Sequence, residues 1–319
     1  MNNYPNNKKR NELDIYGTIS FVIMFIFVSI IILLILYYNG VLSPKNEQNP
    51  FRYTESDTNI YDIPSDDTNL SDAEMLTQES NDNVEILNFN LPSVEIINSD
   101  EPKHYLAELY PDTVLKETTD AGQEYIDNII FLGDSISHGL RSYKMLKDGR
   151  DTNQVWTPVS GTLTLSQANV INILYPDTDT EITIEEAIKL KKPPLLIISL
   201  GVNGVSFMGE EYFKSEYIKL VEMIQTISPG TIIILQSIFP IARSYQHQNS
   251  ISIEKIVTAN EWIAAIAHET GTKYLNTYTA LADEEGFLPE DYQNGDGMHF
   301  NEVGFDIELK YIRTHAYTN

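Results

Sequence analysis

Two short stretches carry the residue types of nucleophilic chemistry. The first, FLGDSISHGL at residues 131–140, places Ser135 directly after an apolar run. The second, NGDGMH at residues 294–299, places Asp296 three residues before His299. A serine hydroxyl, a histidine and a carboxylate can together form and hydrolyse a covalent acyl intermediate. Each stretch taken alone is also compatible with an ordinary turn. Whether it is a turn or part of a catalytic site depends on the elements around it.

The spacing of Asp296 and His299 suits a hydrogen-bonded pair. Three residues apart on a turn, the two side chains lie side by side, and the flanking glycines 295 and 297 allow a sharp bend. The carboxylate then accepts from one ring nitrogen, which leaves the other nitrogen to take a proton. A plain turn before a helix and a metal pair are the alternatives. A metal site would need one or two more ligands, and no HExxH motif or cysteine cluster supplies them, so no metal is expected.

Ser135 needs a base, and His299, with its carboxylate neighbour, is the candidate. His138 lies one helical turn beyond Ser135 and has no such neighbour. We interpret His138 first as a surface residue and second as a substrate contact. The remaining histidines fit less well, because they lie near the domain start, in a polar loop, at a helix end and near the terminus: His104, His247, His268 and His315.

Alternating apolar and amphipathic segments predict the frame that carries these residues. Four apolar runs are typical of buried strands, and a weaker one lies near 155–158; the four are residues 128–132, 195–200, 231–236 and 273–276. Helices are predicted at 210–228, at 252–271 and from 302 to about 317. Thr183 and Glu186 form a capping-box pair before a further helix. Apolar strands alternating with helices favour a parallel sheet covered on both faces, so the predicted fold is an α/β three-layer sandwich.

Small and polar residues follow the predicted strands, at the edge where open α/β sheets bind ligands. The run at 195–200 leads into GVNG, which contains Asn203, and the run near 155–158 leads into VSG, which ends at Gly161. Acyl transfer needs hydrogen-bond donors for the oxyanion. The Ser135 N–H, the Gly161 N–H and the Asn203 amide are candidates, with a plain turn residue as the alternative for Asn203.

The stretches FLGDSISHG, VSG, LGVNG and DGMHF together resemble the four blocks of the SGNH hydrolases, also called the GDSL esterase/lipase family. The resemblance covers roughly residues 127–316. It implies a flavodoxin-like α/β/α fold. It also implies that Ser135 is the nucleophile, that His299 is the general base and then the acid, and that Asp296 orients His299.

The same resemblance implies an oxyanion hole. Its donors would be the Ser135 N–H, the Gly161 N–H and the Asn203 side chain. The family often has Asp directly after the oxyanion Asn, and this chain has Gly204 there. The second block is represented by a single glycine, Gly161 in VSGTL.

The composition argues against several classes of function. The 319 residues include 46 Asp and Glu against 21 Lys and Arg, which gives a formal net charge of −25. Such a surface repels phosphate backbones, so no nucleic-acid partner is expected. The absence of cysteine excludes disulfides, thiolate metal sites and a cysteine nucleophile.

Residues 15–38 carry no charge and are long enough to cross a bilayer, which takes about 20 apolar residues. Lys8, Lys9 and Arg10 precede this run. The positive-inside rule therefore predicts a cytoplasmic tail at 1–14, a single transmembrane helix at 15–38, and everything later outside the cell membrane. A cleaved signal peptide fits less well, because the run is longer than a usual signal core and ends in bulky tyrosines.

Residues 39–100 differ from the rest of the chain. Between residues 51 and 100 there are twelve acidic residues and one basic residue, with few apolar ones. Such a segment cannot bury enough surface to offset its ordering entropy. We therefore expect a disordered linker that spaces the hydrolase domain, residues 101–319, from the membrane, with partner binding by the linker as the alternative. Short apolar clusters at 84–87 and 94–97 are candidates for extra strands on that domain.

These expectations combine into one functional hypothesis. The chain is expected to be a membrane-anchored extracellular serine esterase that needs no metal or organic cofactor. Its substrate would be O-acetyl or other short-acyl esters on cell-envelope glycan or lipid. An O-acyltransferase with the same site, in which a sugar hydroxyl replaces water, is the first alternative. The others are an envelope-binding module that has lost its chemistry, and a scaffold in which the acidic linker is the working part.

Overall fold

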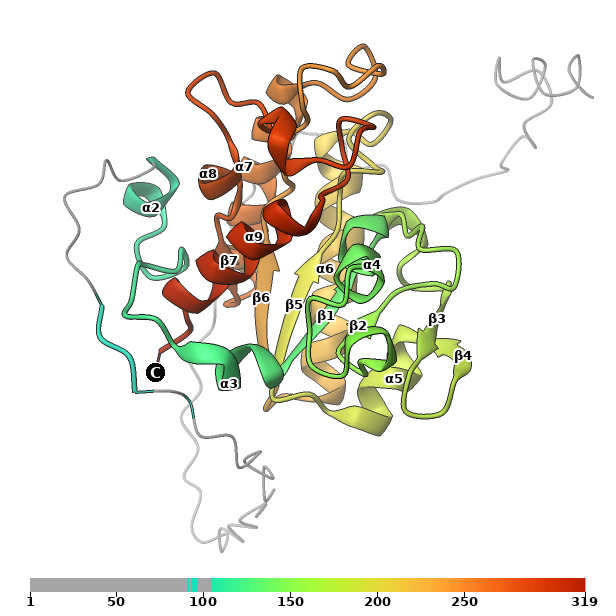
Figure 1. The fold of residues 1–319 in the computed structure, drawn as a ribbon. Helices are drawn as coiled ribbons and strands as arrows, with labels where there is room; N and C mark the ends of the chain where they lie inside the picture. Colours follow the sequence, from blue (N-terminus) through green and yellow to red (C-terminus); the bar gives the residue numbers. More distant parts are fainter. Residues whose placement is uncertain (1–90, 92, 97–104, 319) are drawn as a thin grey trace, which may run out of the picture. The chain divides into compact units, whose positions relative to one another are not determined.

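Five parallel strands form the central sheet (Figure 1). The computed structural model describes residues 91, 93–96 and 105–318, all within the compact unit Gln78–Asn319. The strands lie in the order β2-β1-β5-β6-β7, and every neighbouring pair is parallel. Their bounds are Ile129–Gly133 for β1, Val155–Trp156 for β2, Leu195–Ser199 for β5, Ile232–Gln236 for β6 and Lys273–Leu275 for β7.

The strands form where the apolar runs predict them. The ends differ from the predicted ones by at most two residues. All positions of β1 and β5 are buried, as expected for central strands of a sheet that is covered on both faces. The predicted α/β class with a parallel sheet is therefore confirmed.

Successive residues of a strand face opposite sides of the sheet, and this alternation divides the core into two apolar clusters. In β1, Ile130 and Leu132 belong to the first cluster, whereas Ile129 and Phe131 belong to the second. The other strands divide their residues in the same way. Each cluster is completed by the helices that cover its face.

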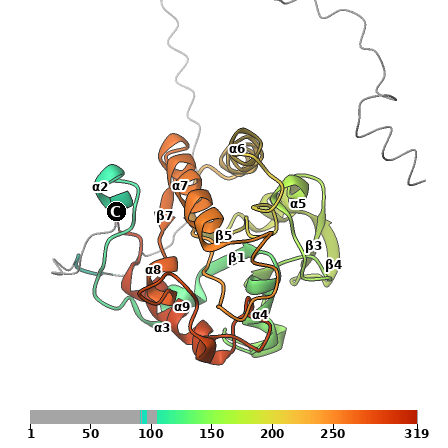
Figure 2. The same cartoon turned by 90° about the horizontal axis from the view of Figure 1, so that it is seen from above.

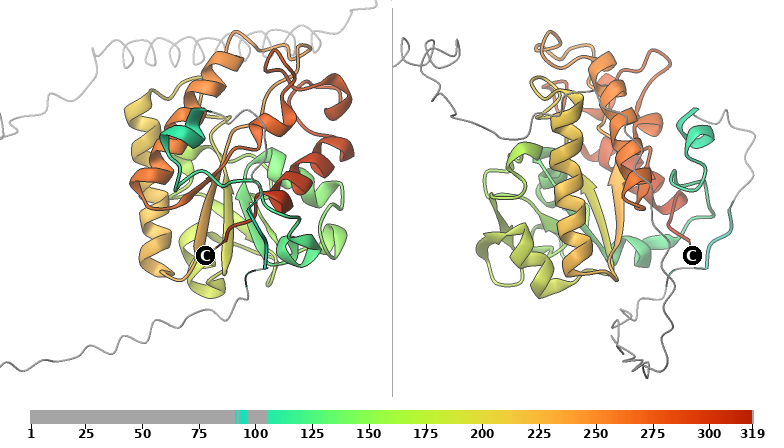
Figure 3. Two further views of the ribbon diagram at one scale, coloured as in Figure 1. Left: turned by 90° about the vertical axis from the view of Figure 1, so that its left-hand side faces the viewer. Right: turned by 180° about the vertical axis from the view of Figure 1, so that it is seen from behind.

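Helices cover both faces of the sheet, which gives three layers. The first cluster is covered by α5 (Ile184–Lys191), α6 (Glu210–Ile227) and α7 (Ile253–Glu269), and α6 stands in front of the sheet in the right-hand view of Figure 3. The second is covered by α3 (Gly122–Asp127), α4 (Ser135–Ser142) and α9 (Glu302–Thr314), which lie on the other side in Figure 2. The short helix α8 (Tyr278–Leu281) also lies on this second side.

Polar side chains begin the helices at positions that the sequence indicates. Both halves of the predicted capping box are present, because Thr183 Oγ1 accepts from the Glu186 N–H and the Glu186 carboxylate accepts from the Thr183 N–H. Asn301 Oδ1 caps α9 by accepting from the N–H groups of Val303 and Gly304. This second cap fixes the end of the loop that carries His299.

Helices α4 and α9 pack directly on each other. Gly139 of α4 lies against the ring of Phe305 of α9, and a Cβ at position 139 would collide with that ring. The helix that begins at Ser135 and the helix that follows His299 therefore approach closely. Their contact helps to set the distance between the two candidate catalytic side chains.

A buried polar pair joins α9 to the end of β6. Gln236 Nε2 donates to Glu308 Oε1 at 3.1 Å and to Thr277 Oγ1 at 3.0 Å. Gln236 is fully buried and Glu308 is 3% exposed. Burial raises the pKa of Glu308 to about 8, although the hydrogen bond from Gln236 lowers it. Glu308 Oε2 and Gln236 Oε1 find no hydrogen-bond partner among the described residues.

Several small elements were not predicted. The antiparallel hairpin of β3 (Asn172–Tyr175) and β4 (Thr180–Thr183) forms its own two-stranded sheet. The short helices α2 (Tyr105–Leu109), α3 and α8 were also not predicted. None of these segments is long enough to show a sustained hydrophobic period.

The predicted transmembrane helix at 15–38, the cluster at 84–87 and most of the predicted linker lie outside the described residues. In the part of the chain that is described, no helix has the length and apolar character needed to cross a bilayer. Of the cluster at 94–97, Ile96 forms an antiparallel bridge with Thr118, and the Thr119 N–H donates to the Glu95 carbonyl at 2.8 Å. This piece of the acidic segment thus pairs with the domain.

Candidate active site

Ser135 lies at the carboxyl end of β1, where it begins α4. Asp134 is the helix cap, because its Oδ1 accepts from the Ile136 N–H at 3.1 Å. The strand order puts β2 on one side of β1 and β5 on the other, so the chain changes direction across the sheet at β1. Ligands of open α/β sheets bind in the crevice at such a switch point. The turn therefore presents the Ser135 hydroxyl at the favoured edge.

His299 bridges Ser135 and Asp296. Its Nε2 lies 2.8 Å from Ser135 Oγ, and its Nδ1 lies 2.6 Å from Asp296 Oδ2. With the ring proton on Nδ1, the imidazole donates to the carboxylate and accepts the serine proton at Nε2. The His299 and Asp296 side chains are 33% and 47% exposed, so the chain of contacts opens to solvent. The structure thus brings together the three residues that the sequence proposed as a catalytic set.

The main chain holds the Asp296 carboxylate in place. Its Oδ1 accepts from the N–H groups of Met298 and His299, at 2.8 and 2.9 Å. Gly295 and Gly297 have φ values of +113° and +83°, so the predicted sharp bend is present. Partial burial alone would raise the pKa of Asp296. The hydrogen bonds from these N–H groups and the interaction with the His299 ring outweigh that effect, so the pKa of Asp296 is lowered. Asp296 is therefore ionised at neutral pH, as an orienting carboxylate has to be.

Asn203 follows β5 and reaches back to the β1 turn. Its Nδ2 donates to the Leu163 carbonyl at 3.1 Å and to Asp134 Oδ2 at 3.4 Å. A side chain at Gly204 would not fit without a shift, because its Cβ would lie 2.7 Å from the sulfur of Met208. Asn203 is thus held by a carbonyl and by the residue before Ser135, and not by a carboxylate at position 204.

Gly161 closes a turn after β2. Its φ is +75°, and its N–H donates to the Pro158 carbonyl at 2.8 Å. In this structure the Gly161 N–H and the Asn203 amide both have acceptors within the protein. To bind an oxyanion, these donors have to exchange their protein acceptors for it.

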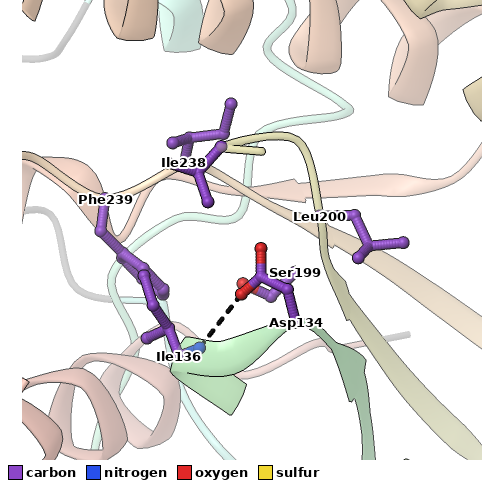
Figure 4. Close-up of a pocket in the computed structure, with 7 residues that line it drawn as sticks. Asp134, Ile136, Ser199, Leu200, Ile238 and Phe239 are labelled. Carbon is purple, nitrogen blue, oxygen red and sulfur yellow. Dashed lines mark hydrogen bonds between the residues drawn. The ribbon is translucent and has the colours of Figure 1, made fainter. Parts of the chain in front are cut away.

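Asp134 is almost fully buried, with 2% of its surface exposed. Burial raises its pKa to about 7, although the Ile136 N–H and the charge of His299 both lower it. Figure 4 shows the carboxylate beside Ser199, Ile238 and Phe239, which help to line a cavity of about 10 Å³. That volume suits one water molecule. The residue before Ser135 therefore titrates near neutrality while it contacts Asn203.

Of the histidines that the structure describes, His299 alone forms a hydrogen bond with Ser135. His138 Nδ1 lies 3.1 Å from Thr157 Oγ1, a contact that the sequence did not predict. Thr157 could have been noticed as a polar residue at the end of a strand, but nothing in the sequence points to its partner. His268 contacts Thr113, and His315 stacks on Tyr311 with 3.7 Å between ring centroids.

No group of three or more His, Cys, Asp or Glu side chains within residues 91, 93–96 and 105–318 is arranged to hold a metal ion. The roles of Ser135, His299, Asp296, Gly161 and Asn203 remain predictions that variants have to test. The contacts themselves permit a serine to lose its proton to a histidine that a carboxylate orients.

Comparison with known proteins identifies the family to which the chain belongs. Residues 131–307 match the GDSL-like lipase/acylhydrolase family. No curated protein matches the chain significantly. Among solved structures, the chain is similar to a GDSL-like lipase from Bacteroides thetaiotaomicron, with 21% identity over 59% of this chain and 88% of that one, and a TM-score of 0.42.

Two further structures illustrate the range of similar proteins. One is an acetylxylan esterase from Geobacillus stearothermophilus, with 19% identity over 60% of this chain and 94% of that one, and a TM-score of 0.39. The other is the periplasmic domain of a lipopolysaccharide acetyltransferase from Salmonella ser. Paratyphi A, with 16% identity over 58% of this chain and 82% of that one, and a TM-score of 0.41.

Proposed function

The chain belongs to the GDSL-like lipase/acylhydrolase family and is an ester hydrolase, and from this premise we propose that it removes short acyl groups from cell-envelope material through an acyl-Ser135 intermediate. The observation that carries the proposal is the contact chain from Ser135 Oγ to His299 Nε2 at 2.8 Å and from His299 Nδ1 to Asp296 Oδ2 at 2.6 Å. A serine in this arrangement is an activated nucleophile.

The proposed reaction has two halves. Ser135 Oγ attacks the ester carbonyl carbon while His299 Nε2 takes the hydroxyl proton, and the tetrahedral intermediate carries its negative charge on the former carbonyl oxygen. The C–O bond to the alcohol then breaks, and His299 returns the proton to the leaving alkoxide. Water attacks the acyl-Ser135 carbonyl by the same route, which releases the acid and restores the hydroxyl. Asp296 stabilises the imidazolium that forms in each half.

The exposure of the proposed catalytic pair supports a large alcohol part in the substrate. His299 and Asp296 are a third to a half exposed, so the site is accessible to a polymer as well as to a small ester. We therefore favour an acylated glycan as the substrate class, and the short length of the acyl group is part of the proposal that the second measurement below tests.

The proposed location is the outer face of the cell membrane. The support is the uncharged run at 15–38 behind Lys8, Lys9 and Arg10, followed by a strongly acidic segment. Intact cells treated with an impermeant protease should lose the domain while a cytoplasmic marker survives. Retention of the full chain in intact cells, with digestion only after lysis, would place the domain inside and refute the proposed location.

To test the chemistry, the full chain in detergent is treated with a fluorophosphonate, and its mass is measured by intact-protein mass spectrometry. One adduct is expected on the wild type, and none on Ser135→Ala or His299→Ala. Ser142→Ala, which changes an exposed serine on the same helix, is the matched control and should still be labelled. No adduct on a folded wild type would refute an activated Ser135 and favour a binding module that lacks chemistry.

A second measurement addresses the substrate class. Hydrolysis of p-nitrophenyl acetate should be much faster than that of the palmitate ester, and acetylated envelope glycan should release acetate. A preference for the long chain would refute the short-acyl proposal. Acetate transferred to an added sugar acceptor instead of released would identify an O-acyltransferase, which uses the same serine with a different acceptor.

A further inference from the structure

We propose that His138 is a positioning residue that, together with Thr157, fixes the turn at residues 158–161, and with it Gly161, relative to Ser135. The proposal rests on the proposed function, because it concerns the place of the Gly161 N–H in the oxyanion site. It gives a specific role to a histidine that the sequence left as a surface residue or substrate contact.

The position of His138 is tied to that of Ser135. Both residues lie in the first turn of α4, where the His138 N–H donates to the Asp134 carbonyl at 2.9 Å. Asp134 also caps this helix through the Ile136 N–H. A side chain that leaves α4 at position 138 therefore has a fixed relation to the proposed nucleophile.

The His138 ring contacts the residue that begins the turn. Nδ1 lies 3.1 Å from Thr157 Oγ1, and Thr157 is only 1% exposed. The Thr157 carbonyl accepts from the Leu174 N–H of β3 at 2.9 Å, so the main chain of Thr157 is held from the other side. Thr157 is thereby fixed between the hairpin and α4.

The same ring lies beside the residue that ends the turn. A Cβ built on Gly161 would be 3.4 Å from His138 Cγ and 3.7 Å from its Cδ2, so the imidazole lies on the side of Gly161 where a side chain would stand. Between these two contacts, Val159 is 60% exposed and Ser160 is also exposed. His138 thus contacts the residue that begins the turn and lies beside the residue that ends it, while the middle of the turn is exposed to solvent.

The contacts suit the task that the turn has to perform. The Gly161 N–H now donates to the Pro158 carbonyl at 2.8 Å and has to reorient toward an oxyanion. That change rotates a peptide group, and with Thr157 fixed and the imidazole beside Gly161 the movement is confined to the turn itself. An interaction that matters in the transition state and not in substrate binding affects kcat more than KM.

His138 stays out of the proton transfers in this arrangement. Burial lowers its pKa, and the charge of Arg141 lowers it further, so the ring is neutral at pH 7. Its Nδ1 is engaged by Thr157 and not by a carboxylate. Its contribution is therefore to geometry.

The experiment compares variants of the full chain in detergent, with p-nitrophenyl acetate as the substrate. His138→Ala and Thr157→Val should each lower kcat about 10- to 100-fold with KM changed less than about twofold. His138→Asn places an amide where Nδ1 was, and Thr157→Ser keeps the hydroxyl, so both should recover most of the activity. The double variant His138→Ala/Thr157→Val should be no worse than either single variant.

Each contrary result has a defined meaning. A raised KM with unchanged kcat in His138→Ala, rescued by His138→Gln and not by His138→Asn, would identify a substrate contact at Nε2 and overturn the proposal. Additive losses, or full activity in both single variants whose unfolding temperatures match the wild type, would also overturn it. A wild type that neither hydrolyses esters nor reacts with the fluorophosphonate would refute the proposed function, and the positioning role with it.

Discussion

The Asn203 amide donates to Asp134 Oδ2 at 3.4 Å, while Asp134 Oδ1 accepts from the Ile136 N–H at 3.1 Å. One buried carboxylate thereby joins the end of β5 to the turn that presents Ser135. The two sides of the proposed oxyanion site are linked through it.

Replacing Asp134 by Asn should weaken this link, because an amide cannot accept at both of its ends. We expect kcat to fall about 10-fold at pH 8 with little change in KM. Burial raises the pKa of Asp134 to about 7, so the wild type carries a carboxylate there at pH 8 and mostly a neutral acid at pH 6. The ratio of wild-type to variant kcat should therefore be larger at pH 8 than at pH 6. A ratio that is constant over this range would contradict the argument.

Removing the charge of Asp296 should damage the reaction and leave the fold intact. In Asp296→Asn the His299 ring loses its charged partner and the preference for the proton on Nδ1, so we expect kcat to fall about 10³- to 10⁴-fold. Asp291→Asn, an exposed change in the same loop, is the control and should be fully active. Steady-state kinetics with p-nitrophenyl acetate measures both. Wild-type kcat in Asp296→Asn would exclude an orienting role for this carboxylate.

Gly161→Ala should lower activity for two separable reasons. The φ of +75° costs an L-residue about 1–2 kcal/mol, and the new Cβ would be in van der Waals contact with the His138 ring, 3.4 Å from its Cγ, which hinders reorientation of the turn. Gly271→Ala is the matched control, because Gly271 has a φ of +67° but nothing within 4 Å of the added Cβ. The unfolding temperature should fall in both variants, whereas kcat should fall only in Gly161→Ala. Equal kcat values in the two variants would remove the support for a functional turn at Gly161.

Glu308→Gln should flatten the dependence of stability on pH. Because burial raises the pKa of Glu308 from about 4.5 to about 8, its contribution to stability is fully present below pH 4.5 and is lost as pH rises through 8. The variant amide cannot ionise and can donate to Gln236 Oε1, which has no partner in the described part of the chain. The free energy of unfolding of Glu308→Gln should therefore exceed that of the wild type at pH 9, on the order of 2–4 kcal/mol.

Urea unfolding at pH 5, 7 and 9 measures this difference. Asp306→Asn makes the same change of charge at an exposed position of α9 and should keep the pH dependence of the wild type. If the free energy of unfolding changed with pH in the same way in Glu308→Gln and the wild type, Glu308 would be ionised at every pH tested, and the argument would be wrong.

The sheet could be predicted because its strands are uniformly apolar. Residues 195–199 are buried on both faces, so no polar position interrupts the pattern. The hairpin of β3 and β4 could not be predicted in this way, because its four-residue strands are not uniformly buried: β3 includes exposed and partly exposed positions, and β4 has no buried position. The burial of Glu308 was predictable from helical spacing. It lies three residues after Phe305 and four before Ile312, and both of these are buried on the inner face of α9.

The candidate site was predictable only in part. The pairing of Asp296 with His299 follows from a local spacing of three residues, and the structure shows it. The bonding of Asn203 depends on the Leu163 carbonyl, a main-chain group 40 residues away that no residue type identifies. The contact between His138 and Thr157 likewise depends on how close α4 and the end of β2 come to each other.

The contact between Ser135 and His299 spans 164 residues of sequence. During translation at about 5–20 residues per second, the proposed nucleophile leaves the ribosome roughly 8 to 33 seconds before its base. A growing chain that has folded β1 and α4 thus carries Ser135 without the histidine that contacts it in the complete domain. On the proposed mechanism, activity arises only when the loop that precedes α9 has been made and has docked, so a partly synthesised chain would not attack esters in the compartment where it is produced.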